Sequence, residues 1–272
     1  MTRRGLVIGN SHAAALRLAQ QAFAADWSGM RLDFAAMHGS AADFCVRAGT
    51  LSARDAKGRK RLFRISGRSD FTLADYDFVA VCGSTPSNFG AIRLYLEARW
   101  IGLPSFQLAE PLGGKNWLLL SEGCFEAALT GIMRAAAAFP LLDALAAAGC
   151  RCFMVPTPLL SAEALTLSKE KHLGFVMMNG NGDAEALSAM MDRALLRACG
   201  GQSTALIWPD SVRVNGFFAR PEFRRGAKRL GTTDTEAQPE EDFFHANADY
   251  GHKVLSELYR QLGLAPSGRA IP

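Results

Sequence analysis

The chain has 272 residues, 49% of them hydrophobic and 21% charged, a globular composition that excludes the disordered and fibrous classes. Its formal net charge of +4 favours neither nucleic acid nor a membrane surface as a partner. No apolar run approaches the roughly 20 residues that span a bilayer. The length suits one α/β domain with insertions.

The spacing of the cysteines and the first residues of the chain indicate the cellular compartment to expect. The six cysteines lack the paired spacings of zinc sites and small disulfide scaffolds, so we expect reduced, mostly buried thiols. Arg3 and Arg4 lead directly into the first apolar run, which leaves no room for a signal peptide ahead of the fold. We therefore expect a cytoplasmic protein.

The first element is a short apolar run that ends in three polar residues. Residues 6–9 suit a buried parallel strand, and Asn10, Ser11 and His12 follow at its end. An alanine-rich helix over 13–25 begins directly after them. Open α/β sheets bind ligands at this kind of junction, and the unpaired N–H groups of a helix start favour negative charge. Ser11 is therefore the first candidate nucleophile.

A second strand is expected over residues 30–36, followed by a turn that contains Gly39. Residues 50–74 are polar and basic around an apolar stretch at 62–65, and they predict a β-hairpin inserted at the sheet edge. We interpret the cations of this insertion as a solvated face, with contact to an anionic substrate as the alternative. They are Arg54, Lys57, Arg59, Lys60, Arg61 and Arg64.

The clearest later strand is the run 77–83, which is closed by glycine and turn-forming residues. A helix through 92–99 is expected to follow. Residues 122–148 are alanine-rich and helical, and Pro140 should break or kink that helix near Phe139.

The second half continues the alternation of strands and helices. It predicts, in order, a strand over 151–156, a helical region over 161–171, a helix over 184–199 capped by Asp183, a strand over 204–208 and a terminal helix over 249–262. The state of 174–178 stays open. Residues 209–241 are rich in glycine, proline and charge, and they predict a long loop of the kind that forms a lid or is disordered.

Strands that alternate with helices over long crossovers predict an α/β protein whose parallel sheet is covered on both faces. Five strands is the expected count. We expect residues 1–272 to form a single domain.

A serine hydroxyl is a weak nucleophile near neutral pH, so Ser11 needs a base. Of the five histidines, His245 has the best setting, because Asp242 lies three residues before it, just ahead of the last helix. In a tight turn Asp242 would accept from one ring nitrogen while the other faces the serine. Singly, these residues have plainer interpretations as helix cap, turn cap and surface histidine. Their order and placement together favour a hydrolase-type site.

A Gly-X-Ser start at the end of the first strand, single glycine and asparagine blocks, and an Asp-X-X-His block near the C-terminus resemble the SGNH/GDSL hydrolase family over residues 9–251. The resemblance implies a flavodoxin-like three-layer α/β/α sandwich. It also implies that Ser11 is the nucleophile, His245 the base and Asp242 the carboxylate that orients the base. No metal or organic cofactor is implied.

The same resemblance implies an oxyanion hole. The Ser11 N–H is one donor, a glycine N–H after the second strand is another, and an asparagine side chain after the third strand completes it. Gly39 and Asn88 take the last two roles by position, with Asn88 two residues later than in the family. The residues assigned weakly to substrate binding are Asn10, which stands where the family has aspartate, His12, Asn247 and Tyr250.

The expected function is a serine esterase that hydrolyses acyl esters through an acyl-enzyme on Ser11. Acetyl is the expected acyl group, and a glycan or a small molecule carries it. Two alternatives stay open: an acyltransferase that acts on a glycan, and a binding protein of the same fold without turnover. Neither a nucleic acid nor a membrane partner is expected. The basic run over 220–229 is interpreted as a solvated lid, with recognition of a substrate carboxylate or phosphate as the alternative.

Overall fold

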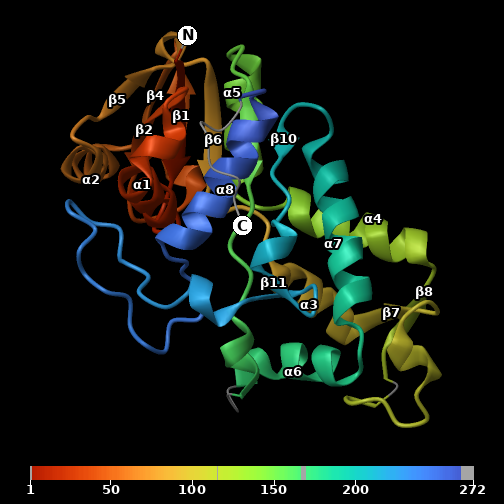
Figure 1. Ribbon diagram of the computed structural model, residues 1–272. Helices are drawn as coiled ribbons and strands as arrows, with labels where there is room; N and C mark the ends of the chain where they lie inside the picture. Colours follow the sequence, from red (N-terminus) through yellow and green to blue (C-terminus); the bar gives the residue numbers. More distant parts are fainter. Residues whose placement is uncertain (1, 115, 167–169, 265–272) are drawn as a thin grey trace.

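The computed structural model describes residues 2–114, 116–166 and 170–264 (Figure 1). Its centre is a five-stranded parallel sheet in the order β2-β1-β6-β9-β10, which confirms the predicted sheet and strand count. The strands are β1 (Arg3–Gly9), β2 (Met30–Ala36), β6 (Phe78–Cys82), β9 (Cys152–Val155) and β10 (Thr204–Ala205).

The buried strands carry an apolar core on each face of the sheet. Along β1, Leu6 and Ile8 belong to one core and Val7 to the other, as the two-residue period of a strand requires. Helices α1 (Ala13–Ala22) and α8 (Ala248–Gln261) cover the Val7 face. Helices also cover the other face, because the buried apolar residues of the helices over 88–97, 122–134, 138–147 and 184–199 pack into the core of Leu6 and Ile8.

The insertion after β2 differs from the prediction. Strands β3 (Phe44–Arg47) and β4 (Thr50–Ala53) form an antiparallel hairpin, β5 (Asp70–Thr72) pairs with β4, and α2 (Ala56–Ser66) lies between them. The prediction of a β-hairpin over 50–74 is correct only for the antiparallel pairing of β4 with β5. It is wrong for the residues between these strands, because residues 62–65 belong to helix α2.

The local chemistry of α2 explains the error. The carboxylate of Asp55 accepts from the Gly58 N–H at 2.6 Å and starts the helix, and Gly67 ends it in the left-handed conformation. The buried positions Gly58, Leu62 and Ile65 recur at helical spacing. An apolar stretch of only four residues, 62–65, does not show whether the segment is a strand or part of a helix.

The middle of the chain contains α3 (Asn88–Glu97), α4 (Glu122–Arg134) and α5 (Ala138–Ala147). The long helix expected around Pro140 breaks earlier than Phe139, and α4 and α5 meet at 75°. Pro140 lies in the first turn of α5, where a missing N–H removes no helical hydrogen bond.

Two short strands, β7 (Ala98–Trp100) and β8 (Leu118–Leu120), flank the loop between α3 and α4 and pair in parallel. In the described residues no single helix is long and apolar enough to cross a membrane. Helices α4 and α5 pass that test only when they are taken together across their bend.

Residues 174–178, whose secondary structure the sequence did not decide, belong to helix α6 (Leu173–Gly180). The following helix, α7 (Ala184–Cys199), has its predicted bounds. Asp183 does not cap α7 with its side chain. Its buried carboxylate accepts from the Tyr95 hydroxyl at 2.7 Å and from the Ser105 N–H at 2.8 Å instead. Tertiary hydrogen bonds thus outcompete the local cap.

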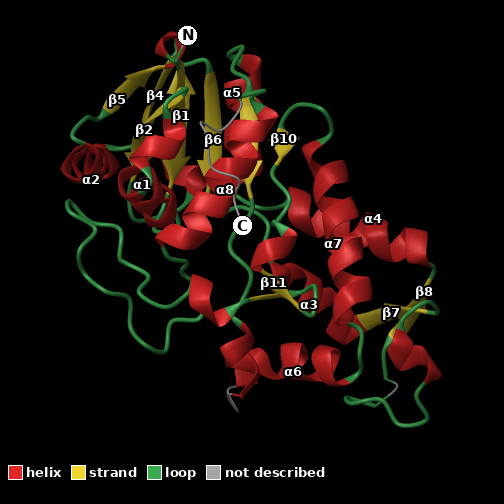
Figure 2. Ribbon diagram, viewed as in Figure 1, coloured by secondary structure: helices red, strands yellow, loops and turns green. Residues whose placement is uncertain are grey.

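The long segment after β10 is mostly loop, as predicted (Figure 2). It contains a two-stranded ribbon, β11 (Arg213–Val214) and β12 (Phe218–Ala219). The helical region expected over 161–171 contains two short 3-10 helices, Ala162–Thr166 and Glu170–His172. All six cysteines are free thiols.

Candidate active site

The fold brings the two ends of the predicted triad together through the packing of α1 on α8. Ser11 lies just before α1 and His245 just before α8. The helices approach closely at Gly251, where a Cβ would lie 2.1 Å from the Ala15 carbonyl oxygen. A side chain there would push the helices apart, so this glycine helps to set the distance between the nucleophile and the base.

The three candidate catalytic residues form one continuous hydrogen-bonded chain. His245 Nε2 lies 2.8 Å from Ser11 Oγ, and His245 Nδ1 lies 2.5 Å from Asp242 Oδ2. The side chains of His245 and Asp242 are 21% and 14% exposed, so both are largely, but not completely, shielded from water. This is the geometry by which a base activates a serine.

The turn over 242–245 is built around the Asp242 carboxylate. Its Oδ1 accepts from the N–H groups of Phe244 at 2.9 Å and His245 at 3.1 Å. Burial by itself would raise the pKa of Asp242, but the hydrogen bonds from the His245 ring and from these N–H groups outweigh it and lower the pKa to about 2. The carboxylate is therefore ionised at neutral pH.

Two backbone N–H groups carry the oxyanion prediction, those of Ser11 and Gly39. In the described parts of the chain, neither the Ser11 N–H nor the Gly39 N–H has an acceptor. The strand register places Gly9 beside both Ala36 and Cys82, so the turns after β1, β2 and β6 lie at one edge of the sheet. Ser11 and Gly39 thus occupy neighbouring turns, as the oxyanion prediction requires.

Asn10 ties these turns together, a role that the sequence did not assign to it. Its Nδ2 donates to the Gly39 carbonyl oxygen at 3.3 Å, and its Oδ1 accepts from the His12 N–H at 3.2 Å. Gly83, after β6, leaves room for this amide, because a Cβ there would lie 1.9 Å from Asn10 Oδ1. The strand-ending glycine was the only sequence signal for this close approach.

Gly83→Ala tests the support of the oxyanion turn. The backbone at Gly83 has a φ of +80°, so alanine should reduce the free energy of unfolding by about 1 kcal/mol or more. It should also lower kcat, because the methyl group displaces the Asn10 amide that holds Gly39. The matched control is Gly67→Ala, with a φ of +71° and no atom within 4 Å of the new Cβ. Equal kcat in both variants, measured beside their unfolding curves, would refute the support role.

Asn88 lies elsewhere than the oxyanion prediction placed it. Its side chain is fully buried at the start of α3, and Nδ2 donates to the Phe217 carbonyl oxygen at 3.3 Å. Within the described chain no hydrogen bond joins Asn88 to Ser11 or Gly39. This hydrogen bond occupies the Nδ2 group in linking α3 to the turn between β11 and β12, so a fully buried Asn88 is not placed to donate to an oxyanion.

His12 packs on the base. Its ring stacks on that of His245 with 4.8 Å between the centroids and 18° between the planes. Burial, and the neighbouring His245 ring, lower the pKa of His12 to about 3. His245 therefore has a neutral aromatic ring against one face at neutral pH, and the contact that the structure gives for the His12 ring is with His245.

This buried histidine should make stability depend on pH. A pKa near 3 in the folded state against about 6.5 unfolded means that the unfolded chain binds the extra proton as the pH falls through 6.5. From pH 7.5 to pH 5, His12 should thus remove about 2 kcal/mol from the free energy of unfolding. His12→Phe keeps an aromatic ring but has no site for this proton. Between pH 7.5 and pH 5, its free energy of unfolding, measured by chemical denaturation, should therefore fall by about 2 kcal/mol less than that of wild type. An equal loss in both proteins would contradict the assignment.

Asn247 and Tyr250, weakly assigned to substrate binding, have internal roles. The Asn247 amide donates to the carbonyl oxygens of Glu222 at 2.7 Å and Arg225 at 2.9 Å, and its Oδ1 caps α8. Tyr250 is 3% exposed and packs on Phe223. Both side chains hold the loop after β12 against α8 and are not open to a substrate.

The basic run over 220–229 is tied down by ion pairs that the sequence did not reveal. Glu163 pairs with Arg224 at 2.8 Å and with Arg225 at 3.2 Å. Arg224 also donates to the carbonyl oxygens of Glu240 at 2.7 Å and Asp242 at 3.4 Å. Arg224 therefore stabilises the turn that contains Asp242 and His245. The sequence around Glu163 gives no sign of its ion pair with Arg224, which lies 61 residues further along the chain.

No group of three or more His, Cys, Asp or Glu side chains lies together as a metal site in the described residues. No family model and no curated protein matches the chain. Among solved structures it is similar to the crystal structure of a DUF4886 family protein from Bacteroides uniformis ATCC 8492. The identity is 10% and the TM-score 0.36, over 98% of this chain and 88% of that one. A likeness this distant carries no argument about the site.

Proposed function

We propose that the protein is a serine ester hydrolase of the SGNH type that acts through an acyl-enzyme on Ser11. The observation that carries the proposal is the hydrogen-bonded chain from Ser11 Oγ through His245 to Asp242. A histidine held between a serine hydroxyl and an ionised carboxylate is the arrangement that turns serine into a nucleophile near neutral pH.

The geometry suggests a role for each group. Ser11 Oγ attacks the ester carbonyl carbon as its proton passes to His245 Nε2, and the imidazolium then protonates the leaving alcohol. Asp242 keeps the other ring proton on Nδ1 and stabilises the charged ring. The N–H groups of Ser11 and Gly39 receive the carbonyl oxygen as it becomes negative. Water, activated by His245, releases the acyl group and restores Ser11.

The fold supports the proposal in a second way. The strand order β2-β1-β6-β9-β10, with helices over both faces, is compatible with the flavodoxin-like three-layer sandwich that we propose for this chain. In such sheets ligands bind beyond the carboxyl ends of the strands, at the point where the strand order reverses. Here that point lies beside β1, which ends in Gly9, two residues before Ser11.

Covalent labelling tests the function directly. A fluorophosphonate probe should label the folded protein on the peptide that contains Ser11, and acetyl esters of phenols should be hydrolysed. Ser11→Ala should abolish both signals, and His245→Ala should slow labelling because the hydroxyl loses its base. Heat-denatured protein is the control for non-specific labelling. A folded wild type that takes no label and hydrolyses no ester would reject the proposal.

The acyl acceptor is tested in the same assay. If acyl release accelerates when a glycan is added at constant water, and an acylated glycan accumulates, the acyl-enzyme transfers to a sugar hydroxyl. Release that is independent of the glycan supports hydrolysis.

A further inference from the structure

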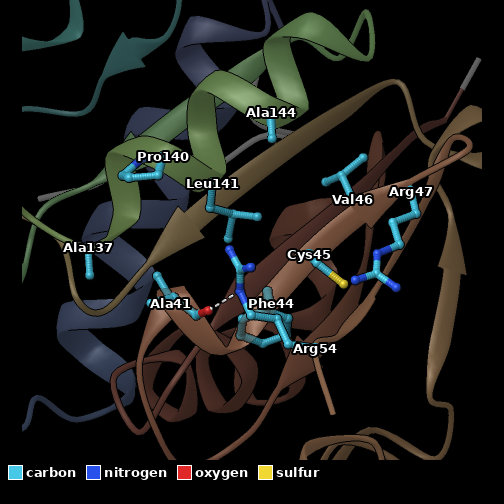
Figure 3. Close-up of a pocket in the computed structure, with 11 residues that line it drawn as sticks. Ala41, Phe44, Cys45, Val46, Arg47, Arg54, Ala137, Pro140, Leu141 and Ala144 are labelled. Atoms are coloured by element: carbon cyan, nitrogen blue, oxygen red, sulfur yellow. Dashed lines mark hydrogen bonds between the residues drawn. The ribbon is translucent and has the colours of Figure 1, made fainter.

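A groove of about 410 Å³ lies between the β3–β4 hairpin and α5 (Figure 3). Its volume falls within the range of small-molecule sites. Phe44 contributes to the lining from the hairpin side and Leu141 from α5, and alanines, Pro140 and Val46 supply most of the rest. The floor is therefore apolar and suits a hydrocarbon or aromatic body.

Among the described residues that line the groove, two carry a charge, and both are arginines: Arg47 and Arg54. Figure 3 shows the Arg54 guanidinium beneath Leu141 and that of Arg47 toward the Cys45 end. The Nε of Arg54 donates to the Ala42 carbonyl oxygen at 2.5 Å, which holds the group in place and leaves both Nη atoms for a ligand. A fixed guanidinium fork matches an oxyanion.

No acidic side chain balances these cations. Within the described residues neither Arg47 nor Arg54 forms an ion pair, and no carboxylate lines the groove. By contrast, Arg224 and Arg225 both pair with Glu163. An apolar floor with unbalanced guanidinium groups favours an amphiphilic anion as ligand.

The groove begins next to the candidate oxyanion turn. Ala41, which lines it, follows Gly39 by two residues, a separation of at most about 7 Å along the chain. The turn is held in place from β6, because Ser84 Oγ accepts from the Ala41 N–H at 3.1 Å and lies 3.4 Å from Ser40 Oγ. A substrate whose carbonyl oxygen meets the Gly39 N–H can thus extend over Ser40 into the groove.

We propose that this groove binds a negatively charged group carried on the apolar part of the ester substrate, so that the enzyme prefers anionic esters to neutral ones. Arg54 and Arg47 recognise the carboxylate or phosphate, and the floor around Phe44 and Leu141 receives the apolar body. This inference rests on the proposed ester hydrolysis at Ser11.

The test compares three acetyl esters that differ in charge: neutral phenyl acetate, 4-acetoxybenzoate and 4-acetoxyphenyl phosphate. At least one anion should have a kcat/KM about tenfold or more above that of the neutral ester, as one charge-assisted contact allows. Arg47→Gln/Arg54→Gln should remove that preference and leave phenyl acetate within about twofold of wild type. The matched control is Arg59→Gln/Arg64→Gln, which removes the same charge from exposed positions on α2 and should keep the preference.

The outcomes separate this inference from the proposed function. Hydrolysis without a preference for either anion, or a preference that survives in the Arg47/Arg54 variant, would overturn the groove assignment. If the wild type hydrolyses none of the esters, the proposed function fails, and calorimetric titration of the two anionic esters into wild type still decides the groove. Binding that is lost in Arg47→Gln/Arg54→Gln supports it, and absence of binding overturns it.

Discussion

Replacing Ser11 with alanine is expected to lower kcat/KM for an acetyl ester by about 10⁶-fold, the size of effect that loss of a triad nucleophile has in serine hydrolases. His245→Ala should give a loss of similar size, because the 2.8 Å contact between Nε2 and Oγ is the path by which the proton leaves the nucleophile. The double variant should lose little more than either single one, since the two groups act as a unit. Steady-state kinetics on the four proteins measure this cycle.

Ser256→Ala is the matched control. This serine is half-buried in α8, and its hydroxyl donates to the His252 carbonyl oxygen at 2.8 Å without contact to the triad. It should keep wild-type kcat. Additive losses in the double variant, or a Ser11→Ala activity within about tenfold of wild type, would show that the two residues do not form the catalytic unit.

Asp242→Asn is expected to lower kcat by about 10⁴-fold at neutral pH. Asparagine retains one oxygen, which can still accept from the N–H groups of Phe244 and His245 and preserve the turn. Its NH₂ group would donate to His245 Nδ1, where the carboxylate now accepts at 2.5 Å. The ring proton then resides on Nε2, so the nitrogen that faces Ser11 cannot take the hydroxyl proton.

A spectroscopic readout separates this effect from a general loss of structure. Nitrogen NMR of the His245 ring should show the proton on Nδ1 in wild type and on Nε2 in Asp242→Asn. The circular dichroism and the denaturation slope of the variant should stay close to those of wild type. Unchanged kcat together with an unchanged tautomer would mean that Asp242 does not orient the base.

The parts that were predictable from the sequence have local causes. A short apolar run closed by glycine defines β1, and the buried faces of β6 and β9 follow from unbroken apolar runs in the same way. Ser11 was identifiable as a candidate because it lies two residues after the end of such a strand. The Asp242–His245 pair was identifiable because three residues suffice for a tight turn. Each of these inferences needed only neighbours along the chain.

Predictions of side-chain roles from neighbouring residues were wrong where a partner distant in the sequence binds the side chain instead. Asp183 should cap α7 by its position, but Tyr95 and Ser105 take its carboxylate. Asn88 follows β6 as an oxyanion asparagine should, yet the Phe217 carbonyl oxygen draws its amide into the core. A buried polar group takes whichever partner the tertiary fold provides, because an unmet hydrogen bond in the core costs about 1–3 kcal/mol.

The sequence by itself determined the α/β class, the strand count and the three residues of the proposed triad, because strand periodicity and turn chemistry are local properties. Only the tertiary structure decided that α1 and α8 pack closely enough to bring His245 to Ser11, 234 residues apart. It also decided that Asn10 holds the Gly39 turn and that a groove lined by Arg47 and Arg54 begins beside that turn. These features depend on which segments meet in space, and pairing across a sheet is set by the whole chain.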